Sequence, residues 1–125
     1  MKIEIKYAHI SSGDQETNIR IWNPEKPDCF AGYLVLEIGE KGKKGGSDFC
    51  CRIATPKGLE QLYIEDENST IIYSRPILIV REYSYQDIWE CIQKIIEDCQ
   101  GVTWNESRDK LLRYFEWEFE DYNQM

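Results

Sequence analysis

Two stretches of alternating apolar and polar residues, separated by a glycine-rich segment, constrain the fold of this chain most strongly. Residues 30–38 place their apolar side chains on one face, and residues 47–54 do the same with Phe49, Cys51 and Ile53. Alternation with a period of two is typical of half-buried strands. The segment between them, GEKGKKGG, is rich in a residue that turns favour. The sequence therefore predicts a β-hairpin.

The glycine-rich segment also carries Lys41, Lys43 and Lys44, so a phosphate-binding loop is an alternative. Such loops have the spacing GxxxxGK(S/T) and lead into a helix. This segment lacks that spacing, and a strand pattern follows it. We therefore interpret it as the tip of the hairpin.

The N-terminal residues 2–10 alternate in the same way, which predicts a further half-buried strand. Ile3, Ile5 and Tyr7 fall on one face of this strand. The single histidine of the chain, His9, continues that face. A lone histidine on an apolar face is typical of a packed, hydrogen-bonded residue rather than a catalytic one.

The segments that connect these elements contain weaker signals. Residues 11–29 are polar and include two prolines, so we expect an irregular connection with a short strand at 19–22. Thr55 followed by Pro56 predicts the start of a short helix. The run 77–80 is apolar on both faces, which predicts a strand in the centre of a sheet.

Two longer helices are predicted in the C-terminal half. Ser84 with Asp87 and Thr103 with Glu106 have the three-residue spacing of capping boxes, which begin helices. The first helix has apolar residues at helical spacing and ends at a glycine. The second continues to about Tyr114.

The order of these elements predicts an α+β fold. In this fold an antiparallel or mixed β-sheet carries a short helix and two C-terminal helices packed on one face. The length of 125 residues suits one domain, so we expect residues 1–125 to form a single domain. Its apolar runs are too short to span a membrane, and the N-terminus has no apolar signal segment. We expect a cytoplasmic protein.

Charge and cysteine content limit the classes of ligand. The formal net charge is −8 at pH 7, and an acidic surface repels nucleic acids and anionic membranes but attracts basic proteins. We therefore expect neither nucleic acid nor membrane as a partner. Five cysteines with no CxxC motif and one histidine predict reduced, packed thiols rather than a zinc site. No cofactor or metal is expected.

The segment FEWEFEDY, residues 115–122, alternates aromatic and acidic side chains. Because the alternation has a period of two, unlike the helical pattern before it, the segment predicts a final strand or extended tail. We expect Trp117 and Phe119 to turn inward and hold the C-terminus, and the carboxylates to form an outward row. The acidic residues that we predict to bind a partner are Glu116, Glu118, Glu120 and Asp121.

Three functional classes are compatible with this acidic strip. Carboxylates two residues apart on a strand lie about 7 Å apart, near the separation in inverting glycosidases, which allows a small acidic hydrolase using Glu116, Glu118 and Glu120. Acid–base catalysis needs carboxylates in unequal environments, however, and these look equivalent. A binding protein fits better, because aromatic anchors surrounded by charge are typical of tight interfaces. A scaffold subunit that forms homo-oligomers is the third alternative.

Five segments, in order and with their spacing, carry a family resemblance over residues 27–122. They are PDCFAGYLVLEIGEKGKKGGSDF, ATPKGL, LIVREYSYQDI, GVTWNES and LLRYFEWEFEDY. Together they resemble the immunity protein 8 family of bacterial polymorphic toxin systems. The resemblance implies a non-enzymatic protein that binds the C-terminal domain of a cognate toxin and neutralises it by stoichiometric occlusion. A basic toxin would suit the acidic surface.

Overall fold

A six-stranded mixed sheet organises the part of the chain that the computed structural model describes, which is residues 2–13, 15–62 and 75–119. The strand order is β2-β1-β3-β4-β5, and β6 also pairs with β4. All pairs are antiparallel except β4 with β5. The strands are β1 (Ile3–Ser12), β2 (Gln15–Asn18), β3 (Ala31–Glu40), β4 (Ser47–Ala54), β5 (Ile77–Ile79) and β6 (Glu116–Trp117).

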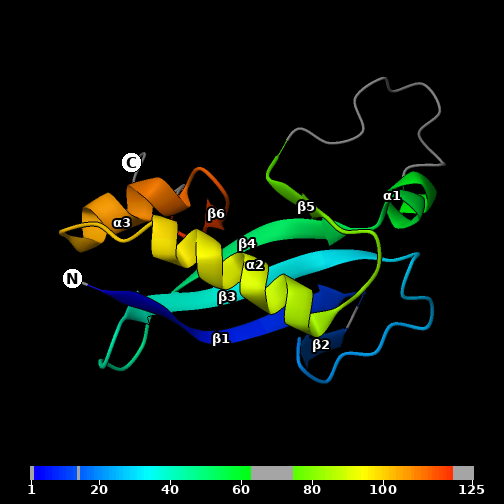
Figure 1. Ribbon diagram of the computed structural model, residues 1–125, viewed down its shortest axis with the longest axis horizontal. Coiled ribbons are helices and arrows are strands. Elements are labelled where there is room, and N and C mark those ends of the chain that lie inside the picture. Colours follow the sequence, from blue (N-terminus) through cyan, green and yellow to red (C-terminus); the bar gives the residue numbers. More distant parts are fainter. Residues whose placement is uncertain (1, 14, 63–74, 120–125) are drawn as a thin grey trace.

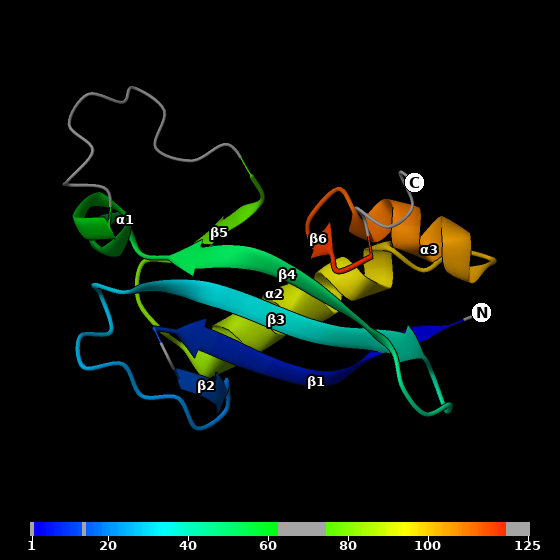
Figure 2. The same cartoon turned by 180° about the vertical axis from the view of Figure 1, so that it is seen from behind.

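The three described helices confirm the predicted α+β arrangement. They are α1 (Pro56–Leu62), α2 (Tyr85–Asp98) and α3 (Trp104–Leu111). α2 runs diagonally across one face of the sheet, and α3 follows it at one end (Figure 1). Seen from behind, the opposite face carries no described helix (Figure 2). None of the described helices is long and apolar enough to cross a membrane.

The predicted starts of the two longer helices are confirmed. The Ser84 hydroxyl accepts a hydrogen bond from the Asp87 N–H, and the Thr103 hydroxyl accepts one from the Glu106 N–H. Each bond satisfies one of the N–H groups that have no partner within the first helical turn. The Glu106 carboxylate accepts from the N–H of Val102 at 2.8 Å, one residue before the position that a reciprocal capping box predicts.

The core lies between α2 and the sheet. Ile88, Ile92 and Ile96 are buried on one side of α2, at the spacing of an amphipathic helix. They meet the inward side chains of the central strands, where alternate residues share a face. The large side chains of β3 and β4 that are fully buried are Leu34, Leu36, Ile38, Phe49 and Ile53.

The predicted hairpin is confirmed. β3 and β4 pair in continuous register from Ala31 opposite Ala54 to Ile38 opposite Ser47. At its tip, Gly42 has a φ of 83°, a left-handed conformation that favours glycine. The lysine-bearing segment therefore joins two strands, as the interpretation of a hairpin tip requires.

β1 departs from the predicted alternation at one residue. Ile5 is opposite Ile38, but Tyr7 is opposite Glu37, so Lys6 is an additional residue in β1. Such a β-bulge inverts the alternation of side chains beyond it. This inversion decides which residues of β1 face solvent.

Beyond the bulge, Ala8 and Ile10 point into the core, whereas Tyr7 is 47% exposed on the other face. His9 follows Tyr7 on that face, and the two rings lie 5.4 Å apart. The prediction that Tyr7 and His9 share the face of Ile3 is therefore wrong.

Two further predictions about strands are wrong. Residues 19–22 contain no strand, because the short strand is β2, which forms a hairpin with the end of β1. Residues 77–79 form an edge strand rather than a central one, since β5 lies at the end of the strand order. Ile79 is 54% exposed, so an apolar run on both faces does not by itself require burial on both faces.

Candidate partner-binding surface

The predicted acidic strip lies beside the start of β4. In the β6–β4 pairing, Glu116 is opposite Cys50 and Trp117 is opposite Phe49. Glu118 directly follows this short strand and is exposed. The other two predicted binding residues, Glu120 and Asp121, lie outside the described residues.

The carboxylates of Glu116 and Glu118 make different contacts. Glu116 Oε2 lies 3.1 Å from Arg75 Nη1. Glu118 Oε1 accepts the N–H of Asp48 at 2.9 Å, while the Glu118 N–H donates to the Asp48 carbonyl at 3.1 Å. Beyond the last β6–β4 pair, the Glu118 carboxylate thus takes the place of a backbone carbonyl as the hydrogen-bond acceptor. The two carboxylates therefore lie in unequal environments, contrary to the expectation that they are equivalent, and each is engaged by a contact of its own.

The two aromatic residues of the strip behave differently. Trp117 packs against the core as predicted, with its ring stacked on Phe49 at a centroid distance of 6.3 Å. The Arg108 guanidinium lies 5.1 Å from the Trp117 ring centroid. Phe119 is 42% exposed and contacts Trp117 edge-on, so the prediction that it turns inward is wrong. The strand ends at Trp117, and the alternation ends with it.

A second pair of carboxylates lies on the face of the sheet that α2 does not cover. Glu37 and Asp48 are directly opposite each other on β3 and β4. Opposite residues of antiparallel strands have Cβ atoms about 4.5–5.5 Å apart, so these like charges repel. Within the described ranges, neither carboxylate has a lysine or arginine at ion-pair distance. Sequence reasoning missed this pair, although the hairpin register alone places the two residues together.

Aromatic and apolar side chains occupy the middle of the same face. Tyr33 is 40% exposed, and the Arg52 guanidinium lies 4.1 Å from its ring centroid. Arg52 Nη2 also donates to the Tyr33 hydroxyl at 2.9 Å. We call this surface the open face; its members are Tyr7, His9, Tyr33, Val35, Glu37, Asp48, Cys50 and Arg52.

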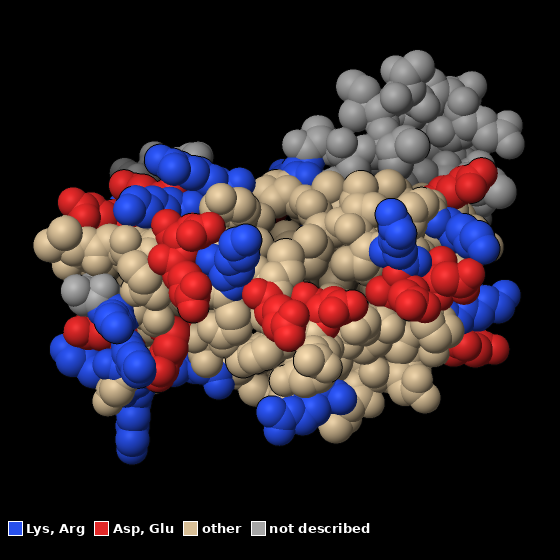
Figure 3. Space-filling model, in the orientation of Figure 1, with Lys and Arg blue, Asp and Glu red and all other residues tan. Residues whose placement is uncertain are grey.

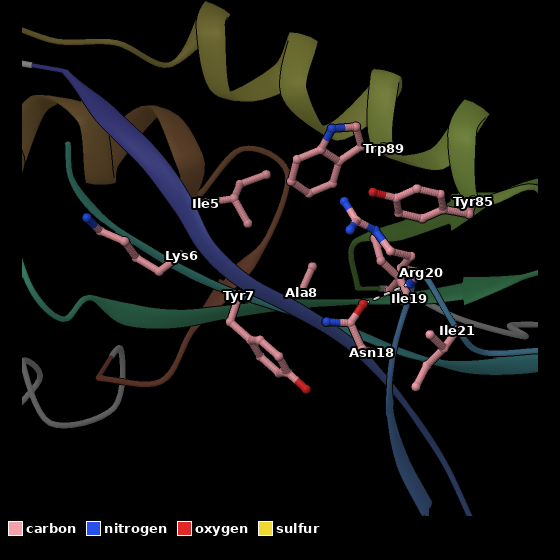
Figure 4. A pocket seen from close by; sticks show the side chains of 10 residues that line it. All are labelled: Ile5, Lys6, Tyr7, Ala8, Asn18, Ile19, Arg20, Ile21, Tyr85 and Trp89. Atoms are coloured by element: carbon pink, nitrogen blue, oxygen red, sulfur yellow. Dashed lines mark hydrogen bonds between the residues drawn. The ribbon is translucent and has the colours of Figure 1, made fainter. Parts of the chain in front are cut away.

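A groove of about 420 Å³ lies at the edge of β1, beside α2. Tyr85 and Trp89 project from α2 on one side, and Ile5 and Ala8 come from β1 on the other (Figure 4). Arg20 lies with its guanidinium 5.8 Å from the Tyr85 ring centroid. The described residues that line the groove include no histidine, cysteine or carboxylate, so it offers apolar and cationic contacts rather than acid–base groups.

The cysteines are free thiols. Those that are buried have low reactivity. Burial raises the pKa of Cys51 to about 12 and also raises the pKa of Cys99. Burial raises the pKa of Cys50 as well, and the charges of Glu116 and Asp48 add to this effect. Because the thiolate is the reactive form, these residues are poor nucleophiles. In the described part of the chain, no three histidine, cysteine, aspartate or glutamate side chains gather as metal ligands.

Comparison with known families shows which family the chain belongs to. The family model described as Immunity protein 8 matches residues 3–122. The chain belongs to the Immunity protein 8 family. The resemblance seen in the sequence is thereby confirmed, and it places the chain among the immunity proteins of toxin systems. No curated protein and no solved structure matches the chain.

This Immunity protein 8 member presents two different broad faces. Along α2, acidic side chains predominate, with basic side chains among and around them (Figure 3). The exposed charged residues of α2 are Asp87, Glu90, Lys94, Glu97 and Asp98. The open face instead combines exposed tyrosines with a repelling carboxylate pair at one end. The predicted partner-binding residues Glu116 and Glu118 lie beside that acidic end, next to Cys50 and Asp48.

Proposed function

We propose that the chain binds the C-terminal domain of a cognate toxin and neutralises it by stoichiometric occlusion. The observation that carries this proposal is membership of the Immunity protein 8 family over residues 3–122. Immunity proteins protect the cell that produces the toxin, and a tight complex is sufficient for that protection. The protein then acts in the cytoplasm without turnover, because one bound copy blocks one toxin molecule.

The charge of the chain supports a basic toxin as the partner. A net charge of −8 on 125 residues attracts a positively charged surface and speeds the encounter. Rapid association matters for an inhibitor that must capture a toxin before it acts. Salt screens such steering, so the association rate of the complex should fall as ionic strength rises.

Co-expression with the gene of the cognate toxin tests the proposal. The chain is produced together with the C-terminal domain encoded there, and growth and co-purification are measured. We expect growth to be restored and the two proteins to elute as one complex. A toxin domain from an unrelated system is the control, which the chain should neither bind nor neutralise. Absence of both rescue and complex with the cognate domain would contradict the proposal.

A further inference from the structure

We propose that the open face is the surface that binds the toxin, and that it takes a basic patch with an apolar centre. This inference rests on the proposed function and adds the location of the interface and the chemistry of the partner. Lysine or arginine side chains of the toxin would sit at the Glu37–Asp48 end. An apolar group would pack beside Tyr7, Val35 and Tyr33.

The first argument is the composition of the open face. An antiparallel sheet with one solvated face normally carries polar residues there. Here Tyr7 and Tyr33 are 47% and 40% exposed, and Val35 lies on the same strand as Tyr33, opposite His9 of β1. Tyrosine and arginine are enriched in the energetically important centres of protein interfaces. The open face thus has the chemistry of an interface centre. No described helix covers this face (Figure 2).

The second argument is the charge at one end of the face. Glu37 and Asp48 repel each other across the β3–β4 ladder, which costs stability in the free protein. A cation placed between them relieves that repulsion and forms charge-assisted hydrogen bonds. Glu116 and Glu118 lie directly beside this end through their pairing with β4. Glu116 is paired with Arg75 there, and Glu118 accepts the backbone N–H of Asp48, so this end still carries more negative than positive charge and is complementary to a positive surface.

The third argument is rigidity. The open face is built on strands, and the hairpin that carries it is in continuous register from Ala31 to Ile38. Tyr33 is held by the Arg52 guanidinium through both ring contact and a hydrogen bond. Side chains that are already ordered lose little conformational entropy on binding. The surface is therefore preorganised for a partner.

The groove beside α2 has the opposite electrostatic character. Its described charged residues are Arg20 and Lys6, the latter paired with Glu4 at 2.6 Å, so it would suit an acidic segment rather than a basic one. The overall charge of −8 disfavours approach of such an acidic segment. Charge complementarity thus favours the open face over the groove for a basic toxin.

Affinity measurements with the full chain and the cognate toxin C-terminal domain test this inference. The principal variant is Glu37→Gln with Asp48→Asn, and a second variant is Tyr33→Ala. We expect each to weaken binding at least about tenfold. The carboxylate variant should also flatten the salt dependence of the dissociation constant, whereas Tyr33→Ala should leave that dependence unchanged. Thermal unfolding of each variant checks that it is folded.

A matched control carries the same chemical change on the opposite face. Glu90→Gln with Glu97→Gln alters two exposed carboxylates of α2, and we expect its affinity to stay within about twofold of the wild type. Arg20→Gln, in the groove, should behave in the same way. Unchanged affinity in both open-face variants, or an equal loss in the α2 or groove variants, overturns the inference while the proposed function stands. A wild-type chain that does not bind the toxin overturns both.

Discussion

Glu37 and Asp48 are directly opposite each other on β3 and β4, and no described lysine or arginine neutralises either. Their repulsion lowers the stability of the free protein. We therefore expect Glu37→Gln to raise the free energy of unfolding by about 0.2–1 kcal/mol, measured by urea denaturation. A lower free energy of unfolding in this variant would mean that the carboxylate makes a stabilising contact.

Thr55 joins the start of α1 to the start of β3. Its hydroxyl oxygen accepts the N–H groups of Phe30 and Gly58, both at 3.0 Å, and the residue is fully buried. Thr55→Val keeps the shape but leaves both donors without an acceptor, so we expect a loss of about 2–3 kcal/mol in the free energy of unfolding. Thr55→Ser retains the acceptor and should lose clearly less. Equal losses in the two variants would contradict a role for the hydroxyl.

Trp117 anchors β6 to the core through its stacking on Phe49. Because the ring is only half-buried, we expect Trp117→Ala to lower the free energy of unfolding by about 2–3 kcal/mol, below the value for a fully buried tryptophan. Phe119→Ala removes a more exposed ring and is the comparison variant. A loss below about 1 kcal/mol for Trp117→Ala would show that its packing contributes little and would move Trp117 to the candidate interface.

Cys51 makes stability sensitive to alkaline pH. Burial raises the pKa of its thiol from 9.0 to about 12, so the folded protein holds this proton more tightly than the unfolded chain does. The stabilisation is complete below pH 9 and is lost as pH rises toward 12, by roughly 1.4 kcal/mol per pH unit. Cys51→Ala should flatten this part of the pH profile of the unfolding free energy.

The control for this prediction is Cys91→Ala, because Cys91 is exposed. Because burial contributes more than the neighbouring Cys91 thiol to the raised pKa of Cys51, this variant should flatten the pH profile between 9 and 12 much less than Cys51→Ala does. A Cys51→Ala profile as steep as the wild-type profile would assign the alkaline loss to other groups.

Local signals predicted the elements that depend on neighbouring residues. The hairpin followed from alternation around a glycine-rich tip, and the starts of α2 and α3 followed from Ser84 and Thr103. The bulge at Lys6 has no comparable local signal, since it is visible only in the pairing of β1 with β3. The placement of β5 at the sheet edge depends likewise on contacts between distant segments.

On the candidate surface too, local patterns predicted some features and missed those that depend on contacts between distant segments. Alternation identified Glu116 and Glu118 as acidic residues of a terminal strand. Their contacts with Arg75 and Asp48 cross 41 and 70 residues of sequence, so no local pattern predicts them. The Glu37–Asp48 pair lay within reach of sequence reasoning, because the register of the predicted hairpin determines it.

Titration of the toxin with this protein tests the central claim most directly. The activity of a fixed amount of the cognate toxin C-terminal domain is measured against increasing amounts of the chain. Stoichiometric occlusion predicts a linear fall that reaches zero at a ratio of about one to one when the concentrations exceed the dissociation constant. Full activity in the presence of excess chain, or complete loss at a small fraction of one equivalent, would contradict inhibition by a one-to-one complex.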